Sequence, residues 1–209
     1  MYPDQPNLGV DKPVLSTIVF IISQDGKSVL LGKKKRGFAT GIINGFGGKK
    51  HPDETMAACA IRELEEESGI TMAESDLTYC GMIRAVFQRP TTNWTMEIAL
   101  FRGIFQGQDP IESEEMAPSW YRIDSLPFQD MWDDDPSWLP GVLHGGFVMG
   151  DFLYVDKVNR VIESVIEHHN PSACSRCIAQ ESGHCPLIPR EFPTSLRSWI
   201  GNGGFFSQS

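Results

Sequence analysis

The segment that decides the fold is Gly48–Ile70, which reads GKKHPDETMAACAIRELEEESGI. Apolar residues recur in it at helical spacing, at Ala57, Ile61 and Leu64. Gly69 stands where a helix commonly ends, so the pattern predicts a helix over Thr55–Ser68. The apolar stripe is expected to pack on a sheet and to leave an acidic face on the opposite side of the helix.

Three glutamates share that acidic face, because Glu63, Glu66 and Glu67 follow one another at helical spacing. Like charges at this spacing repel, so we expect that neutralising one of them would keep or raise the stability of the metal-free protein. Beside a glycine-rich loop, fixed carboxylates suit a hard cation such as Mg²⁺, which prefers oxygen ligands. The alternative interpretation of the three glutamates alone is a solvated helix face.

The spacing of the whole segment is more specific than its acidic face. Nine positions match the pattern G-x5-E-x7-R-E-U-x-E-E-x-G-U, in which U is aliphatic: Gly48, Glu54, Arg62, Glu63, Leu64, Glu66, Glu67, Gly69 and Ile70. From average residue usage, a chance match in a chain of this length has a probability on the order of 10⁻⁷. The segment resembles the Nudix box of the Nudix hydrolase family.

This resemblance implies an α/β (α+β) fold, in which a mixed β-sheet is sandwiched between helices, and hydrolysis of a nucleoside diphosphate linked to another moiety. It implies Mg²⁺ as the cofactor, with Mn²⁺ as a substitute. The residues that match metal ligands are Gly47, through its carbonyl, Glu63, Glu66, Glu67 and the distant Glu115. Glu54 and Arg62 match a pair that fixes the loop on the helix, and the catalytic base is left open between Glu67 and Glu115.

Four further segments narrow the substrate, and they lie at 30–38, 44–49, 112–121 and 127–140. They resemble the oxidised purine nucleoside triphosphate hydrolases, the mammalian 8-oxo-dGTPase in particular, in the same order along the chain. The resemblance implies hydrolysis of 8-oxo-dGTP and 2-hydroxy-dATP to nucleoside monophosphate and pyrophosphate. Such an activity sanitises the nucleotide pool.

The same resemblance implies a set of substrate-binding residues. They are Thr17 and Lys34 on the first two strands, the loop residues Phe46, Gly47, Gly48 and Lys49, the amide Asn44, the apolar or aromatic walls Phe38, Phe87, Met96 and Trp132, and the acidic loop Asp133, Asp134 and Asp135. Taken singly, such aromatic residues are more often ordinary core, and such charged residues are more often solvated loop. The aligned context favours Asn44, Trp132, Asp134 and Asp135 as residues that bind the base.

The acidic pair Asp134–Asp135 is expected to have an unusual proton distribution. Two adjacent carboxylates repel when both are buried and ionised, so the pKa of one should rise. A protonated carboxyl donates where a carboxylate accepts, so a pair that exchanges these roles suits more than one oxidised purine.

The chain departs from the family pattern in this region. Ala85 replaces an aromatic residue, Ile43 replaces a tryptophan, and extra residues lie around Arg89–Trp94. The exact base preference therefore stays open.

Composition excludes several other classes of protein. The chain of 209 residues has 27 acidic and 18 basic residues, a net charge of −9, which argues against a binder of nucleic-acid polymers. No apolar run reaches the roughly 18–20 residues of a membrane span, and no secretory signal is visible at the N-terminus. We therefore expect a monomer with a small-molecule substrate, no membrane partner and a cytoplasmic location, with the nucleus and mitochondria left open. The five cysteines are expected to be reduced thiols.

Periodicity predicts further elements around the box. Strands are expected at 14–23, 28–32, 78–87, 95–105 and 116–123, a loop with a short helix at 127–140, and a last hairpin at 146–155 and 159–167, whose second arm is also compatible with a helix. Residues 1–13 are expected to form an N-terminal extension and 14–170 the catalytic domain.

The C-terminal segment 171–209 has a different composition. Pro, Gly and Ser make up 15 of its 39 residues, which is typical of a disordered tail. An alternative is a zinc site formed by Cys174, Cys177, His184 and Cys185, although this spacing fits no standard zinc finger.

Two functional alternatives remain from the sequence. One is a Nudix pyrophosphatase for another nucleotide, such as a dinucleotide or a nucleotide sugar. The other is a non-catalytic nucleotide-binding module, which would usually have lost a glutamate of the box.

Deleting residues 171–209 tests the predicted tail. Because this segment has few core-forming runs, hydrolysis by the shortened protein should stay within a few-fold of the full chain. The measurement is kcat/KM together with a thermal melt. A shortened protein that does not fold would show that the segment belongs to the core.

Overall fold

The computed structural model describes residues 13–88, 94–155 and 160–169. Eight strands among these residues form one mixed sheet. They are β1 Val14–Ile22, β2 Ser28–Lys34, β3 Ile43–Asn44, β4 Leu77–Gln88, β5 Trp94–Ile104, β6 Met116–Arg122, β7 Phe147–Val155 and β8 Arg160–His169. Their order is β3-β2-β1-β5-β4-β7-β8, and β6 pairs with β2 on a branch.

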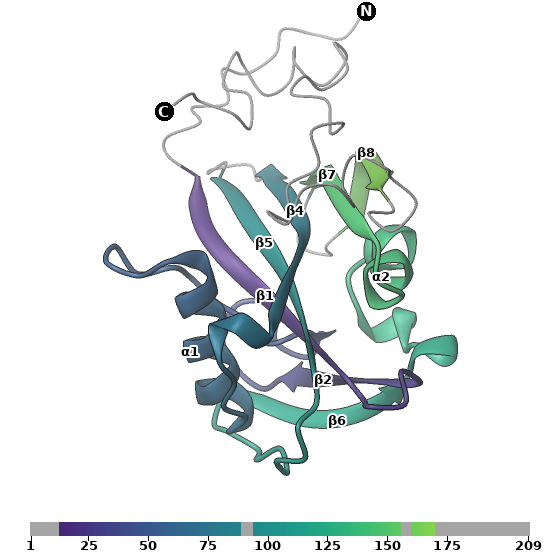
Figure 1. Ribbon diagram of the computed structural model, residues 1–209. Helices are drawn as coiled ribbons and strands as arrows, with labels where there is room; N and C mark the ends of the chain where they lie inside the picture. Colours follow the sequence, from purple (N-terminus) through teal and green to yellow (C-terminus); the bar gives the residue numbers. More distant parts are fainter. Residues whose placement is uncertain (1–12, 89–93, 156–159, 170–209) are drawn as a thin grey trace, which may run out of the picture.

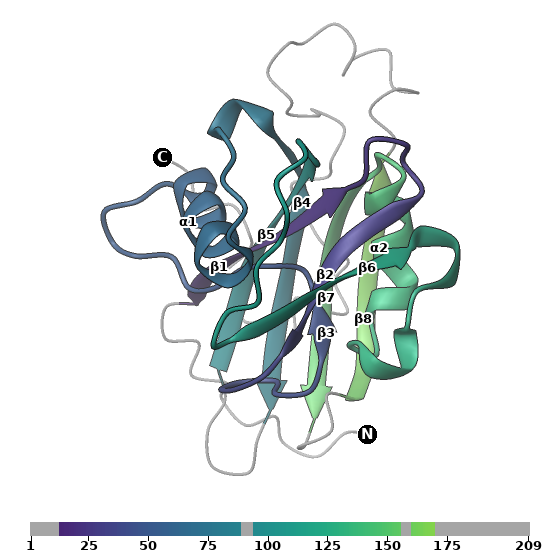
Figure 2. The same ribbon diagram turned by 90° about the horizontal axis from the view of Figure 1, so that it is seen from below.

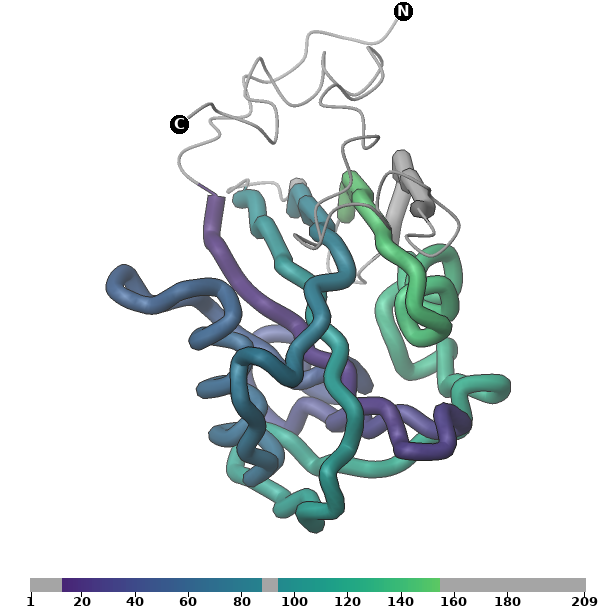
Figure 3. Tube along the Cα trace, viewed as in Figure 1, coloured from purple at the N-terminus to yellow at the C-terminus, as the bar shows by residue number. Residues whose placement is uncertain are grey.

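Two parallel strand pairs make the sheet mixed. β1 pairs in parallel with β5, and β4 pairs in parallel with β7, whereas the other neighbours are antiparallel. Figure 3 shows β1 and β5, which are far apart in the sequence, running side by side. The segment 159–167, which the sequence left open between a strand and a helix, is a strand. β8 pairs antiparallel with β7 from His169 to Arg160.

One helix covers each face of the sheet (Figures 1 and 2). Helix α1, Met56–Ser68, packs with Val19, Ile21 and Phe46, and helix α2, Asp135–Leu143, packs on the other face with Phe20 and Phe152. Short 3₁₀ helices occur at Glu74–Asp76, Ile123–Ser125 and Phe128–Asp130. The predicted sandwich of a mixed sheet between helices is confirmed.

Helix α1 begins and ends where the sequence predicts. The Thr55 hydroxyl accepts a hydrogen bond from the Ala58 N–H at 2.9 Å, which satisfies one free donor at the helix start. Gly69 ends the helix in the left-handed conformation, with φ +71°, and its N–H donates to the Glu65 carbonyl.

The glycine-rich loop before α1 is held against β1 by backbone hydrogen bonds. Val19 and Phe46 exchange two of them, and the Thr17 N–H donates to the Gly48 carbonyl at 3.0 Å. A side chain at Gly47 would place its Cβ 1.9 Å from the Thr17 carbonyl oxygen, so only glycine allows this approach. The loop therefore lies directly over β1 at the start of α1.

Some of the predictions fall outside the described residues. These are the N-terminal extension up to residue 12, the insertion at 89–93, the tail from 171 and the alternative zinc site. Among the described cysteines, Cys59 and Cys80 are buried free thiols. The described helices include none that is long and apolar enough to cross a membrane.

Candidate active site

A cavity of about 920 Å³ joins the glycine-rich loop and α1 to the start of α2. Most of the predicted site residues line it: Thr17, Lys34, Phe38, Asn44, Gly47, Gly48, Lys49, Glu63, Glu66, Glu67, Phe87, Met96, Glu115, Trp132, Asp134 and Asp135. Its volume is within the range of small-ligand sites. One end is rich in carboxylates, and the other end is aromatic.

Arg62 organises the carboxylate end. Its guanidinium binds both oxygens of Glu54, at 2.8 and 3.1 Å, and donates to the Lys49 carbonyl. The predicted loop–helix pair is therefore present, and the hydrogen bonds from Arg62 lower the pKa of Glu54 to about 2. The same guanidinium reaches Glu63 at 2.7 Å and Glu66 at 3.1 Å.

Lys34 forms ion pairs with two further carboxylates of this end, Glu67 and Glu115. Its ammonium lies 2.8 Å from Glu67 and 3.0 Å from Glu115, although the two glutamates come from different elements. Glu67 is buried and also accepts the Gly47 N–H at 2.9 Å. Burial raises the pKa of Glu67, and the hydrogen bonds from Lys34 and Gly47 oppose this shift.

These ion pairs correct the expectation that neutralising a glutamate would stabilise the metal-free protein. Glu63, Glu66 and Glu67 each have a basic partner, so they are not a set of mutually repelling charges. Glu67 is also only 3% exposed, which contradicts the alternative of a fully solvated acidic face.

The described residues contain no group of three His, Cys, Asp or Glu side chains that is close enough to hold a metal ion. The chemistry of the donors nevertheless fits a hard divalent cation, because five glutamates, Glu63, Glu66, Glu67, Glu114 and Glu115, line one end of one cavity. Gly48 leaves room for one of them, since a Cβ there would lie 2.4 Å from the Glu63 carboxylate.

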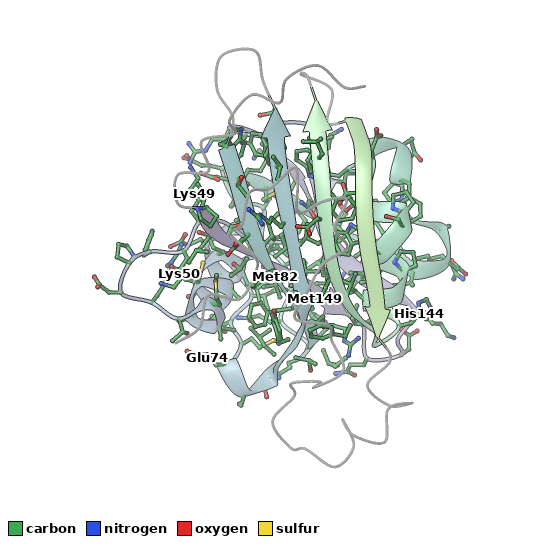
Figure 4. The ribbon with its side chains drawn as sticks, turned by 90° about the horizontal axis from the view of Figure 1, so that it is seen from above. Lys49, Lys50, Glu74, Met82, His144 and Met149 are labelled. Atoms are coloured by element: carbon green, nitrogen blue, oxygen red, sulfur yellow. The ribbon has the colours of Figure 1, made fainter. Side chains whose placement is uncertain are left out.

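The loop basic residue Lys49 is exposed at the edge of the same end (Figure 4). Lys49 lies in the loop before α1 and lines the same cavity as the carboxylates. Its ammonium forms no ion pair with them among the described contacts. Lys49 is thus available to an anionic ligand.

Stacked aromatic rings build the other end of the cavity. Trp94, Phe87 and Tyr154 are register partners on β5, β4 and β7. The Phe87 ring stacks on Trp94 at 4.3 Å and on Tyr154 at 4.8 Å, with 13° between the planes in both pairs. Phe38 and Trp132 pack at the edge of this stack, with their ring centres 5.7 Å apart. Trp94 and Tyr154 thus cover the two faces of Phe87, and Phe38, Phe87, Trp132 and Tyr154 give the cavity an apolar, aromatic wall.

Polar atoms at the aromatic end are few and fixed. Asp135 is buried and accepts the Trp132 N–H at 3.0 Å, and Asp134 accepts the indole N–H of Trp138 at 2.9 Å. The second oxygen of Asp134, Oδ1, is also buried but has no hydrogen-bond partner. A buried acceptor that lines a cavity without a partner is suited to a donor from a ligand.

The pKa shifts follow the predicted direction. Burial raises the pKa of Asp134, and burial together with the charge of Asp134 raises that of Asp135 well above its usual range. At the same end, the Asn44 amide oxygen accepts the Gly45 N–H at 2.8 Å, which fixes the orientation of this amide.

Some predicted substrate residues are not placed for contact. Phe46 packs in the core beneath α1, and Asp133 is exposed, so neither lines the cavity. The Thr17 hydroxyl lies 3.5 Å from the Cys59 thiol on α1, although Thr17 lines the cavity. Of the two substituted positions in the family pattern, Ala85 lines the cavity, whereas Ile43 is buried in the core beside it.

Sequence reasoning missed several residues that line the cavity, among them the aromatic residues Tyr154 and Trp138. Trp138 lies one helical turn after Asp134, a spacing that predicts their contact once α2 is assumed. Tyr154 and Phe152 are two residues apart and share one face of β7. Because the segment 147–155 is apolar on both faces, the sequence does not indicate which face lines the site.

Comparison with known proteins agrees with this geometry. Residues 12–142 match the family model of the NUDIX domain. The chain belongs to the Nudix family. Over 140 residues it is 43% identical to the oxidized purine nucleoside triphosphate hydrolase of Danio rerio, covering 67% of this chain and 86% of the relative. The protein of the same name from Mus musculus is 39% identical over 143 residues, covering 68% and 88%.

A solved Nudix-family neighbour supports the fold. The mutator protein MutT of Bacillus halodurans superposes with a TM-score of 0.62 at 22% sequence identity. The match covers 74% of this chain and 97% of that chain. At this identity the likeness concerns the fold alone.

The substitution Glu67→Gln tests the carboxylate end of this Nudix site. Because it keeps the shape and removes the charge, kcat should fall by about 10²–10⁴. Stability without metal should fall by about 1–3 kcal/mol, since Lys34 loses a buried partner. Steady-state kinetics and denaturant unfolding measure the two effects.

The matched control for this test is Glu65→Gln, an exposed residue on the same helix. Its kcat and stability should stay close to those of the unchanged protein. Near-normal turnover in Glu67→Gln would contradict the assignment of Glu67.

Proposed function

We propose that this Nudix hydrolase acts on oxidised purine nucleoside triphosphates and releases nucleoside monophosphate and pyrophosphate. The observation behind this proposal is that one cavity joins the carboxylates of the Nudix box to an aromatic pocket with a buried, unpartnered acceptor on Asp134. The names of the Danio rerio and Mus musculus relatives support the same substrate class. Removal of oxidised purine nucleotides would sanitise the nucleotide pool.

Nudix hydrolases generally use a divalent metal, and we propose Mg²⁺, with Mn²⁺ as a substitute. The residues that would hold it are Glu63, Glu66, Glu67 and Glu115, with the Gly47 carbonyl. When bound, the ion supplies positive charge for the triphosphate oxygens and activates the attacking water. An ion is needed because the protein, at −9, would otherwise repel the substrate.

The chain itself contributes binding, orientation and proton transfer. Lys34 and Lys49 line the carboxylate end and can donate to phosphate oxygens. Attack of water on the β-phosphorus breaks its bond to the oxygen that bridges to the α-phosphorus, which leaves with the nucleoside monophosphate. The proton of the water is accepted by a carboxylate, for which Glu67 and Glu115 are the candidates.

The aromatic end would recognise the base. Phe87, Trp132 and Met96 offer apolar surface, whereas Asn44, Asp134 and Asp135 offer hydrogen bonds. Oxidation changes donors and acceptors on the purine but leaves the triphosphate unchanged. Discrimination must therefore depend on the polar groups of the aromatic end and not on the Nudix box.

The oligomeric state, the partners and the location of the protein are also proposals. The protein is proposed to act as a monomer on a small-molecule substrate in the cytoplasm, without a nucleic-acid polymer or a membrane as partner. Its net negative charge supports the absence of a nucleic-acid partner.

Replacing Asp134 or Asp135 with Asn tests base recognition. The substitution fixes an amide where a proton can otherwise be exchanged, which should cost about 1–3 kcal/mol, or about 5- to 150-fold in kcat/KM. The loss should differ between 8-oxo-dGTP and 2-hydroxy-dATP, because their edges present different donors. The measurement is kcat/KM for both substrates and for dGTP and dATP.

Asp133→Asn is the matched control, because Asp133 is the exposed member of the same run of aspartates. Its selectivity should be unchanged. An equal loss on all substrates in the Asp134 and Asp135 variants would show that the pair supports structure. An unchanged protein with no preference for oxidised purines, or with a dinucleotide or nucleotide sugar as its best substrate, would contradict the proposed function.

A further inference from the structure

The ammonium of Lys34 occupies the centre of the carboxylate end. It donates to Glu67 Oε1 at 2.8 Å and to Glu115 Oε2 at 3.0 Å, and its side chain is 20% exposed. Burial lowers the pKa of Lys34, but the two carboxylates outweigh burial and raise it. Through these two ion pairs, Lys34 links α1 to the loop before β6.

The remaining oxygens of these two glutamates are also occupied. Glu67 Oε2 accepts the Gly47 N–H at 2.9 Å, and Glu115 Oε1 accepts from Arg36 at 3.0 Å. A divalent cation that binds both glutamates must therefore replace a donor that is already present. The Gly47 N–H is fixed by the backbone, and Arg36 contacts Glu115 and Glu114 but not Glu67. The donor that Glu67 and Glu115 share is therefore Lys34.

Lys34 is also free to move once it is released. Its backbone is held by hydrogen bonds with Gly41 and Ile42, but its side chain is a flexible four-carbon stem that lines the cavity. The same ammonium can therefore turn from the carboxylates toward an anion in the cavity without a change of fold.

We propose that Lys34 is a displaceable counter-ion: it holds Glu67 and Glu115 in the metal-free protein, yields them to a divalent cation and then binds the triphosphate. This inference rests on the proposed function, which supplies the metal and the triphosphate. It makes the binding of metal and of triphosphate mutually favourable, because each ligand removes the competitor of the other.

The experiment titrates Mn²⁺ into the full-length protein without nucleotide and follows free Mn²⁺ by electron paramagnetic resonance. Lys34→Met keeps the apolar stem and removes the charge. Its Kd for Mn²⁺ should fall by roughly 5- to 20-fold, at the lower end of the range for coupled sites. Lys34→Arg keeps the charge and should restore a Kd close to that of the unchanged protein.

Lys35→Met is the matched control. Lys35 is the next residue and is also ion-paired, but its partner is Glu112, and it does not line the cavity. Its Kd for Mn²⁺ should be unchanged. A second titration with inorganic triphosphate should show that Mn²⁺ strengthens triphosphate binding less in Lys34→Met than in the unchanged protein.

A measurement on the unchanged protein covers the case in which Lys34→Met does not fold. Saturating Mg²⁺ should expose the Lys34 amine and increase its labelling by an acylating reagent, whereas labelling of Lys35 should stay the same. Mass spectrometry of the labelled peptides reports both.

The outcomes separate this inference from the proposed function. An equal or weaker Mn²⁺ affinity in Lys34→Met, or Lys34 labelling that does not respond to Mg²⁺, would overturn the displaceable counter-ion. No Mn²⁺ binding by the unchanged protein would instead contradict the proposed metal site itself.

Discussion

The close approach of the glycine-rich loop to β1 is the constraint on which the site depends. The Thr17 N–H binds the Gly48 carbonyl, and no side chain fits at Gly47. This contact places the start of α1 over the sheet, so the helix delivers Glu63 and Glu67 to the cavity from one side. β1 pairs in parallel with β5, which carries Met96 of the cavity lining, so the same sheet holds the loop and part of the aromatic end.

Charge balance explains how so acidic a site can exist in a folded, metal-free protein. Two basic side chains, Arg62 and Lys34, each bind carboxylates that would otherwise repel one another. Arg62 and Lys34 differ in the other groups that their side chains bind. Arg62 is also bound to both oxygens of Glu54 and to the Lys49 carbonyl, so it is part of the scaffold. Among the described residues, the Lys34 ammonium pairs with the site carboxylates Glu67 and Glu115 alone, so its position can respond to a cation.

The sequence predicts those features whose signal is local or periodic. Helix α1, its two ends and the succession of the main strands along the chain follow from spacing and turn residues, whereas the order of the strands in the sheet does not. The neutralisation of Glu67 by Lys34 does not, since the two residues lie on different elements and their contact depends on the folded sheet. Three consecutive aspartates are also alike in sequence. Only the start of α2 shows that Asp134 and Asp135 turn inward and Asp133 outward.

The aromatic end shows how the departure at Ala85 is accommodated. On β4, Ala85 and Phe87 face the same side of the sheet, and both line the cavity. The small Ala85 lies between its strand partners Met96 and Phe152, next to the stack of Trp94, Phe87 and Tyr154, and leaves more space there than an aromatic side chain would. Tyr154 adds a hydroxyl to this wall. Its pKa is raised well above the usual range by burial and by the nearby charge of Asp134, so it remains a neutral donor. Ala85 therefore adds space, and Tyr154 adds a polar group, to a wall of the cavity that is otherwise apolar.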